Sequence, residues 1–108
     1  MPKYLIERSV PGLSKLSPEE LQKMAEKSNC AIEHMGPAYR WHHSYIVGDT
    51  MYCVHEAKNE EAIREHSRRG GFPVTSVREI EGQIGPATGK PKSSQTRSEP
   101  AFKMVAGG

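Results

Sequence analysis

Imidazole is concentrated in one stretch of the chain, residues 39–57, with the sequence YRWHHSYIVGDTMYCVHEA. This stretch holds His42, His43 and His55, three of the five histidines, together with the only tryptophan. His66 follows in the next segment, and Glu7 adds a carboxylate near the N-terminus. Imidazole binds divalent metals and also acts as a general acid or base near neutral pH. These residue types therefore favour either a metal site with nitrogen and oxygen ligands or acid–base chemistry on a small molecule.

The two cysteines argue against a disulfide framework and against a thiolate metal site. Cys30 and Cys53 are far apart in the sequence, and no Cys-x-x-Cys motif occurs. A reducing compartment fits this usage. The N-terminal sequence MPKYLIERSV has only a short apolar run before its charged residues, unlike a signal peptide or a membrane span. We therefore expect a cytoplasmic protein that does not bind membranes.

The charge of the chain is not that of a nucleic-acid-binding protein. Its formal net charge is +2, but residues 86–108 carry four cations against Glu99, which leaves residues 1–85 with a net charge of −1. Residues 86–108 contain three prolines, three glycines and three serines and have no apolar period. This composition predicts a disordered or docking tail after a single domain of residues 1–85.

Capping and turn signals divide residues 1–85 into strands and helices. An apolar run at residues 3–10 predicts a first strand, and the sequence SPEE at residues 17–20 is a capping box that starts a first helix ending near Gly36. The pair Gly48-Asp49 predicts a hairpin within residues 39–57. A second helix is expected from Asn59 to Gly70, and a weaker strand at residues 74–84.

This order, β-α-β-β-α-β, is typical of a ferredoxin-like α+β sandwich. In that fold a four-stranded antiparallel sheet carries both helices on one face. Because the two faces of the expected hairpin are both partly apolar, we expect a second copy to cover the other face, in an α+β barrel-type homodimer.

The register of the hairpin distributes the histidines between the two faces. A loop at Gly48-Asp49 pairs His43 with Val54 and His42 with His55. Side chains alternate along a strand, so one face carries Trp41, His43, Tyr45, Tyr52, Val54 and Glu56, and the other carries His42, Ser44, Ile46, Met51, Cys53 and His55.

We expect the helices to cover the aromatic face of this hairpin. His66 belongs to the inward stripe of the second helix, so His43 and His66 are predicted to meet inside the protein. Glu7 would add an oxygen ligand or orient an imidazole. His42 and His55 are either further ligands or an ordinary cross-strand pair.

Several motifs together resemble a known family, the domain of unknown function 4242. They are YLIERSVPG at residues 4–12, WHHSY at 41–45, MYCV at 51–54, EEAIREH at 60–66 and GGFP at 70–73. The resemblance covers residues 3–85 and implies a ferredoxin-like sandwich, a homodimer and a histidine-based metal site, with nickel as the metal. Its patterns match Trp41, His43, Ser44, Tyr45 and His66, whereas His42 and His55 stand where apolar or aromatic residues are expected.

The sequence thus predicts a small homodimeric metal-binding protein. The predicted ligands are His43 and His66, with Glu7, His42 and His55 as possible additions, and the donor types suit nickel, zinc or copper. The alternative is a small enzyme that uses histidine and tyrosine, with or without a metal, on a small-molecule ligand between sheet and helices. An interaction domain with inert histidines is a third reading.

Overall fold

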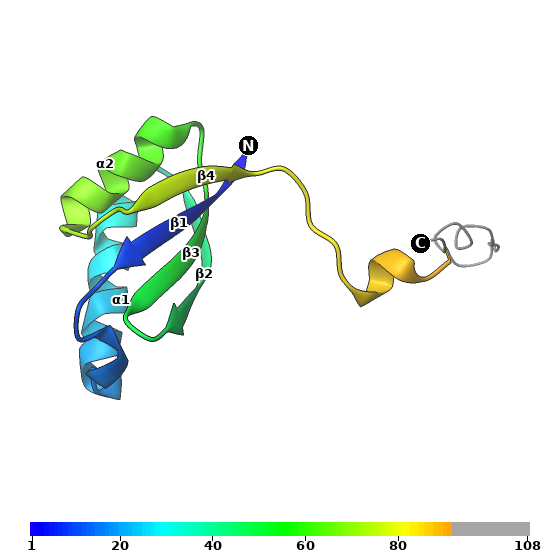
Figure 1. The fold of residues 1–108 in the computed structure, drawn as a ribbon. Coiled ribbons are helices and arrows are strands. Elements are labelled where there is room, and N and C mark those ends of the chain that lie inside the picture. Colours follow the sequence, from blue (N-terminus) through cyan, green and yellow to red (C-terminus); the bar gives the residue numbers. More distant parts are fainter. Residues whose placement is uncertain (92–108) are drawn as a thin grey trace.

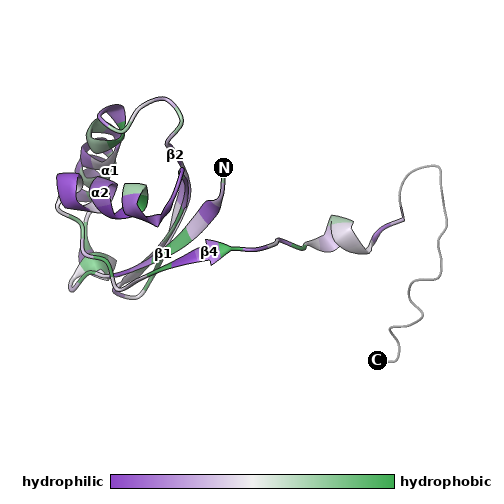
Figure 2. Cartoon of the chain, turned by 90° about the horizontal axis from the view of Figure 1, so that it is seen from above, coloured by the Kyte–Doolittle hydropathy of each residue, from purple (hydrophilic) through white to green (hydrophobic). Residues whose placement is uncertain are grey.

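The chain follows the predicted order of strands and helices. The computed structural model describes residues 1–91 and contains β1 (Lys3–Ser9), α1 (Pro18–Glu33), β2 (Arg40–Val47), β3 (Thr50–Glu56), α2 (Glu60–Gly70) and β4 (Ser76–Ile80). The strands form one antiparallel sheet in the order β2-β3-β1-β4 (Figure 1). Both helices lie on the same side of this sheet (Figures 1 and 2). The predicted ferredoxin-like α+β fold is therefore confirmed.

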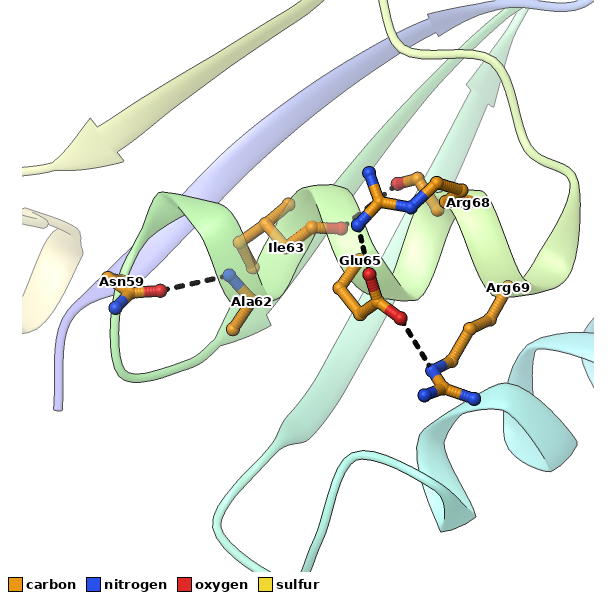
Figure 3. Close-up of polar contacts among 7 residues, drawn as sticks. Asn59, Ala62, Ile63, Glu65, Arg68 and Arg69 are labelled. Atoms are coloured by element: carbon orange, nitrogen blue, oxygen red, sulfur yellow. Dashed lines mark hydrogen bonds and ion pairs between the residues drawn. The ribbon is translucent and has the colours of Figure 1, made fainter.

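Local capping interactions fix where each helix begins and ends. At the start of α1, Ser17 accepts a hydrogen bond from the backbone of Glu20, and the Glu20 side chain accepts one from the Ser17 amide. The side chain of Asn59 caps α2 by accepting from the amide of Ala62 (Figure 3). At the other end of α2, Gly71 takes a left-handed conformation with φ of 72°, which glycine adopts without strain.

Strand alternation divides the sheet into a covered face and an open face. On β1, Tyr4, Ile6 and Arg8 are buried beneath the helices, and they pair with alternate residues of β3, including the buried Cys53 and His55. With residues from the helices and loops, these side chains form the core, which contains Tyr4, Ile6, Tyr39, Cys53, Ala57 and Ile63.

The open face has no helix over it and exposes several large apolar side chains. Leu5 on β1 is 37% exposed, and Tyr45 and Val47 on β2 are 60% and 62% exposed. Glu7 lies on the same face because it pairs with Tyr52, which in turn pairs with Tyr45. The homodimer predicted to cover this face remains a prediction.

A β-bulge changes the predicted register at the start of β2. Residues 43–47 pair with β3 as predicted, with His43 opposite Val54. The register then shifts, so that Trp41 rather than His42 lies opposite His55. His42 is the extra residue of the bulge. The predicted pairing of His42 with His55 is therefore wrong.

The choice of covered face was also wrong. His43 and Tyr45, predicted to face the helices, are exposed on the open face, whereas Cys53 and His55 are buried under the helices. Trp41 joins the covered side through the bulge and is half-buried. Small side chains such as Ser44 and Cys53 leave room for a helix to approach closely, and Tyr45 with its polar hydroxyl tolerates exposure.

The C-terminal part of the described chain is only partly regular. The last strand is shorter than the predicted 74–84, and a short 3₁₀ helix, Pro86–Gly89, follows at a distance from the sheet (Figure 1). Residues 92–108, most of the predicted tail, lie outside the described residues. Within residues 1–91, no helix combines the length and the apolar composition that a membrane span requires.

Candidate functional site

Two imidazoles meet in the interior between the sheet and the helices. His55 on β3 and His66 on α2 are each 1% exposed, and their ring centroids are 4.9 Å apart at an interplanar angle of 64°. Tyr39, from the loop before β2, joins them. Its hydroxyl lies 2.6 Å from His55 Nδ1, and its ring stacks on His66 at 5.3 Å.

Burial keeps this group uncharged at neutral pH. It lowers the pKa of His55 to about 3, with smaller contributions from His66 and from the Arg8 guanidinium. Burial also lowers the pKa of His66 to about 4, again assisted by Arg8. The pKa of Tyr39 is raised by burial, so its phenol stays protonated and can donate to a neutral His55.

One nitrogen of His66 has no partner. Its Nε2 lies 3.1 Å from the hydroxyl oxygen of Ser28 on α1. Its Nδ1 is buried and makes no hydrogen bond within residues 1–91. Buried polar atoms are nearly always hydrogen-bonded, and an unsatisfied one costs roughly 1–3 kcal/mol. His66 Nδ1 is therefore a free donor or acceptor in the interior.

Arg8 brings a buried positive charge to the same region. It is 3% exposed, and its Nη1 donates to Ser67 Oγ and to the carbonyl of Pro73, both at 2.9 Å. Its guanidinium carbon lies 5.4 Å from the centroid of the Phe72 ring. No ion pair within residues 1–91 includes Arg8. Both acceptors of its hydrogen bonds are neutral, so the charge is not balanced by a nearby carboxylate.

A cavity of about 150 Å³ lies between the covered face of the sheet and the helices. Most of its wall is apolar. The polar part of the wall comes from the residues just described and from Trp41 and Ser44 on β2. The lining residues that carry polar side-chain groups include Arg8, Ser28, Trp41, Ser44, His55 and His66. This is the location where the sequence led us to expect a small-molecule pocket, with His66 in its wall as predicted but with His55 in place of His43.

A second group of donors lies on the outside of the protein. Because of the bulge, the consecutive residues His42 and His43 are both exposed, whereas a regular strand would turn them to opposite faces. His42 Nε2 lies 3.0 Å from Glu56 Oε1. Glu56 belongs to the open face, and its hydrogen bond with His42 holds its pKa below the usual value. The ring of His43 packs at 5.1 Å from that of Tyr45.

The five predicted ligands thus separate. His55 and His66 come together inside, while His43, His42 and Glu7 lie on the open side of the sheet. The predicted contact between His43 and His66 is wrong, because the sheet lies between them. Within residues 1–91, no group of three or more His, Cys, Asp or Glu side chains is arranged to hold a metal ion. Whether any of the five binds a metal stays a prediction.

Sequence reasoning missed Arg8, Ser28 and Tyr39 at the interior site. A signal for Arg8 was present, since it follows Tyr4 and Ile6 at the two-residue spacing of a buried strand face. Ser28 lies on the buried face of α1, and nothing in the sequence assigned it a polar contact. Tyr39 gave no local signal, because a loop residue is brought into a core only by the packing around it.

Comparison with known proteins agrees with this fold. A crystal structure of SCO4226 from Streptomyces coelicolor A3(2) is similar with a TM-score of 0.65 and 13% sequence identity, covering 76% of this chain and 99% of that one. No curated protein matches the chain. A family model described as "Nickel responsive protein SCO4226-like" matches residues 4–80. The resemblance to the domain of unknown function 4242 is compatible with this match, and the chain belongs to the SCO4226-like family.

Proposed function

We propose that the protein is a homodimeric nickel-binding protein whose metal sites lie on the open side of the sheet, around His42 and His43. The observation that carries this proposal is the bulge in β2, which leaves two consecutive imidazoles accessible, one of them 3.0 Å from the Glu56 carboxylate. Bulges commonly re-aim side chains beside functional sites. The nickel responsiveness in the family's description supports the choice of metal.

The donor types fit a divalent first-row metal, but one chain supplies too few donors in one place. Imidazole nitrogen and carboxylate oxygen suit nickel, zinc and copper. His42 and Glu56 form a pair, and no group of three ligands occurs within residues 1–91. A complete site in this proposal therefore takes water or donors from a second subunit.

The exposed apolar side chains support a second subunit at this face. Leu5, Tyr45 and Val47 are uncovered on the open face, and burying them against an identical face would be favourable. Sheet-to-sheet association would also bring His43 and Glu7 of both copies into one interface. Glu7 is thus proposed as an additional ligand that the dimer brings into use.

The interior histidines are less suited to nickel and to catalysis. Within residues 1–91, His55 and His66 offer two imidazoles without a third ligand of the His, Cys, Asp or Glu type. With pKa values of about 3 and 4 they are also weak bases, whereas a general base works best with a pKa near the operating pH. This favours a binding role over acid–base catalysis for the interior cavity.

The metal proposal is tested by calorimetric titration of the full chain, without a purification tag, with Ni²⁺. His42→Gln and His43→Gln are each expected to weaken nickel binding about tenfold or more, because each removes a nitrogen ligand. His34→Gln is the matched control, since His34 is exposed at the C-terminal cap of α1. Equal nickel affinity in the wild type and both variants would refute the proposed location, and loss of binding in His66→Gln alone would move the site to the interior.

A further inference from the structure

The cavity between sheet and helices is lined by a buried cation that has no balancing anion within residues 1–91. A guanidinium removed from water is costly unless it is paired. Arg8 is 3% exposed, and its two hydrogen bonds within residues 1–91 both use Nη1 and go to neutral oxygens. The rest of its fork of N–H donors remains for another acceptor. Since Arg8 lines the cavity, an anionic group placed there would meet it directly.

Other polar groups line the same cavity beside Arg8. His66, which is 1% exposed, and the Ser28 hydroxyl, which lies 3.1 Å from His66 Nε2, both contribute to the lining. The Nδ1 of His66 is enclosed by protein atoms and does not face the open volume. Direct contact with an anionic group in the cavity therefore falls to Arg8.

The other walls of the cavity determine the chemical character of the rest of the bound molecule. They are largely apolar and include Leu21, Met24, Ile46, Met51 and Phe72. A dry apolar cavity of about 150 Å³ can hold a molecule of the size of benzene. The volume here is about 150 Å³, so the apolar part of an occupant is limited to roughly one ring.

The surroundings of Arg8 would also attract an anion from solution. A neighbouring cavity of about 390 Å³ shares Arg8, Met24, Met51 and Phe72 with the first and is also lined by Lys23 and Lys27. Its one carboxylate, Glu20, is held in the capping box of α1. Clustered positive charge beside a cavity raises the local concentration of anions.

From these observations we infer that the interior cavity binds a small organic monocarboxylate about the size of a single aromatic ring, with Arg8 receiving the carboxylate and the apolar walls receiving the ring. Carboxylate and guanidinium match in geometry and form charge-assisted hydrogen bonds. This site is separate from the proposed nickel site. It concerns the same cavity as the catalytic alternative but requires no reaction.

Benzoate is the probe, and benzamide is its neutral counterpart of similar shape. Titration of the full chain is followed by calorimetry and by the fluorescence of Trp41, the only tryptophan, which lines the cavity. Benzoate is expected to bind about tenfold or more tightly than benzamide, because only the carboxylate gains a charge-assisted pair with Arg8. Equal affinities for the two molecules, or no saturation by benzoate, would overturn the inference.

Two variants test which residues are responsible. Arg8→Met should abolish the preference for benzoate over benzamide, and Arg64→Met is the control because Arg64 is exposed on α2 and pairs with Glu60. Ala25→Leu fills the cavity from α1 and should weaken both probes without removing any charge. If Arg8→Met does not fold, comparing the affinities of the two probes for the wild type and for Ala25→Leu still tests the inference. Benzoate binding that survives Ala25→Leu unchanged would refute the location.

The nickel titration of Ala25→Leu separates this inference from the proposed function. Nickel affinity should not change in this variant, since Ala25 lines the interior cavity and the proposed metal site is on the open side of the sheet. Loss of benzoate binding with normal nickel binding supports the inference, and the reverse pattern contradicts it.

Discussion

The imidazoles of His55 and His66 lie 4.9 Å apart in the interior of the protein, one from the sheet and one from the second helix. Neither can take up a proton there without cost, because burial and the Arg8 guanidinium disfavour a positive charge on both rings, and His66 adds to this effect at His55. The stability of the packing between α2 and the sheet therefore depends on pH.

Acidification should destabilise the protein through these histidines. Their pKa values are about 3 and 4 in the folded chain and about 6.5 when unfolded. Between these pKa values the unfolded state binds more protons than the folded state. The contribution of the two histidines to stability is therefore complete above pH 6.5 and is lost as the pH falls through their folded-state pKa values. The free energy of unfolding should fall by up to about 1.4 kcal/mol per pH unit for each histidine between pH 6 and 4.5.

Urea unfolding at several pH values measures this slope. Replacing His66 by Gln removes one of the two titrating groups and should reduce the slope, whereas the exposed His34→Gln should leave it unchanged. An identical pH dependence in His66→Gln and the wild type would show that the interior pair is not its source.

Tyr39→Phe should lower the free energy of unfolding by about 1–3 kcal/mol, because it leaves His55 Nδ1 buried without its partner at 2.6 Å. The phenylalanine ring keeps the stacking on His66, so the decrease in the free energy of unfolding measures the contribution of the hydroxyl. Tyr45→Phe is the matched control: Tyr45 is 60% exposed, and the change should cost less than about 0.5 kcal/mol. Equal stability of the two variants would mean that the hydrogen bond contributes little.

Tyr45→Glu should dissociate the proposed homodimer. A carboxylate buried in the proposed apolar interface must be desolvated without a partner, and about a tenfold or greater increase in the dimer dissociation constant is expected. Sedimentation equilibrium of the wild type and the variant measures it, with Gln22→Glu on the exposed side of α1 as control. A monomeric wild type at micromolar concentrations would count against the dimer itself.

Glu56→Gln should weaken nickel binding to a similar degree as His42→Gln. Glu56 and His42 are in contact, so the double variant should lose less than the sum of the two single losses. Titration with Ni²⁺ gives the four affinities, and Glu33→Gln on α1 controls for the general loss of negative charge. Fully additive losses would indicate that the two residues do not share one ion.

Local sequence signals determined the elements and most of their limits. The capping box at Ser17 and Glu20, the cap at Asn59 and the left-handed Gly71 act within a few residues, so the sequence alone specifies them. The turn at Gly48 likewise set the register of residues 43–47 of the hairpin. The inward position of His66 also followed from the helical period, and it is buried as predicted.

Only the tertiary structure decided which face of the sheet the helices cover. Alternation along a strand sorts side chains into two sets, but it does not say which set is buried, because that depends on how closely a helix can approach each one. The bulge at His42 was also decided by the tertiary structure, since no local sequence pattern required the extra residue there. Together these two features brought His55, rather than His43, to His66, because that contact depends on packing between segments distant in the sequence.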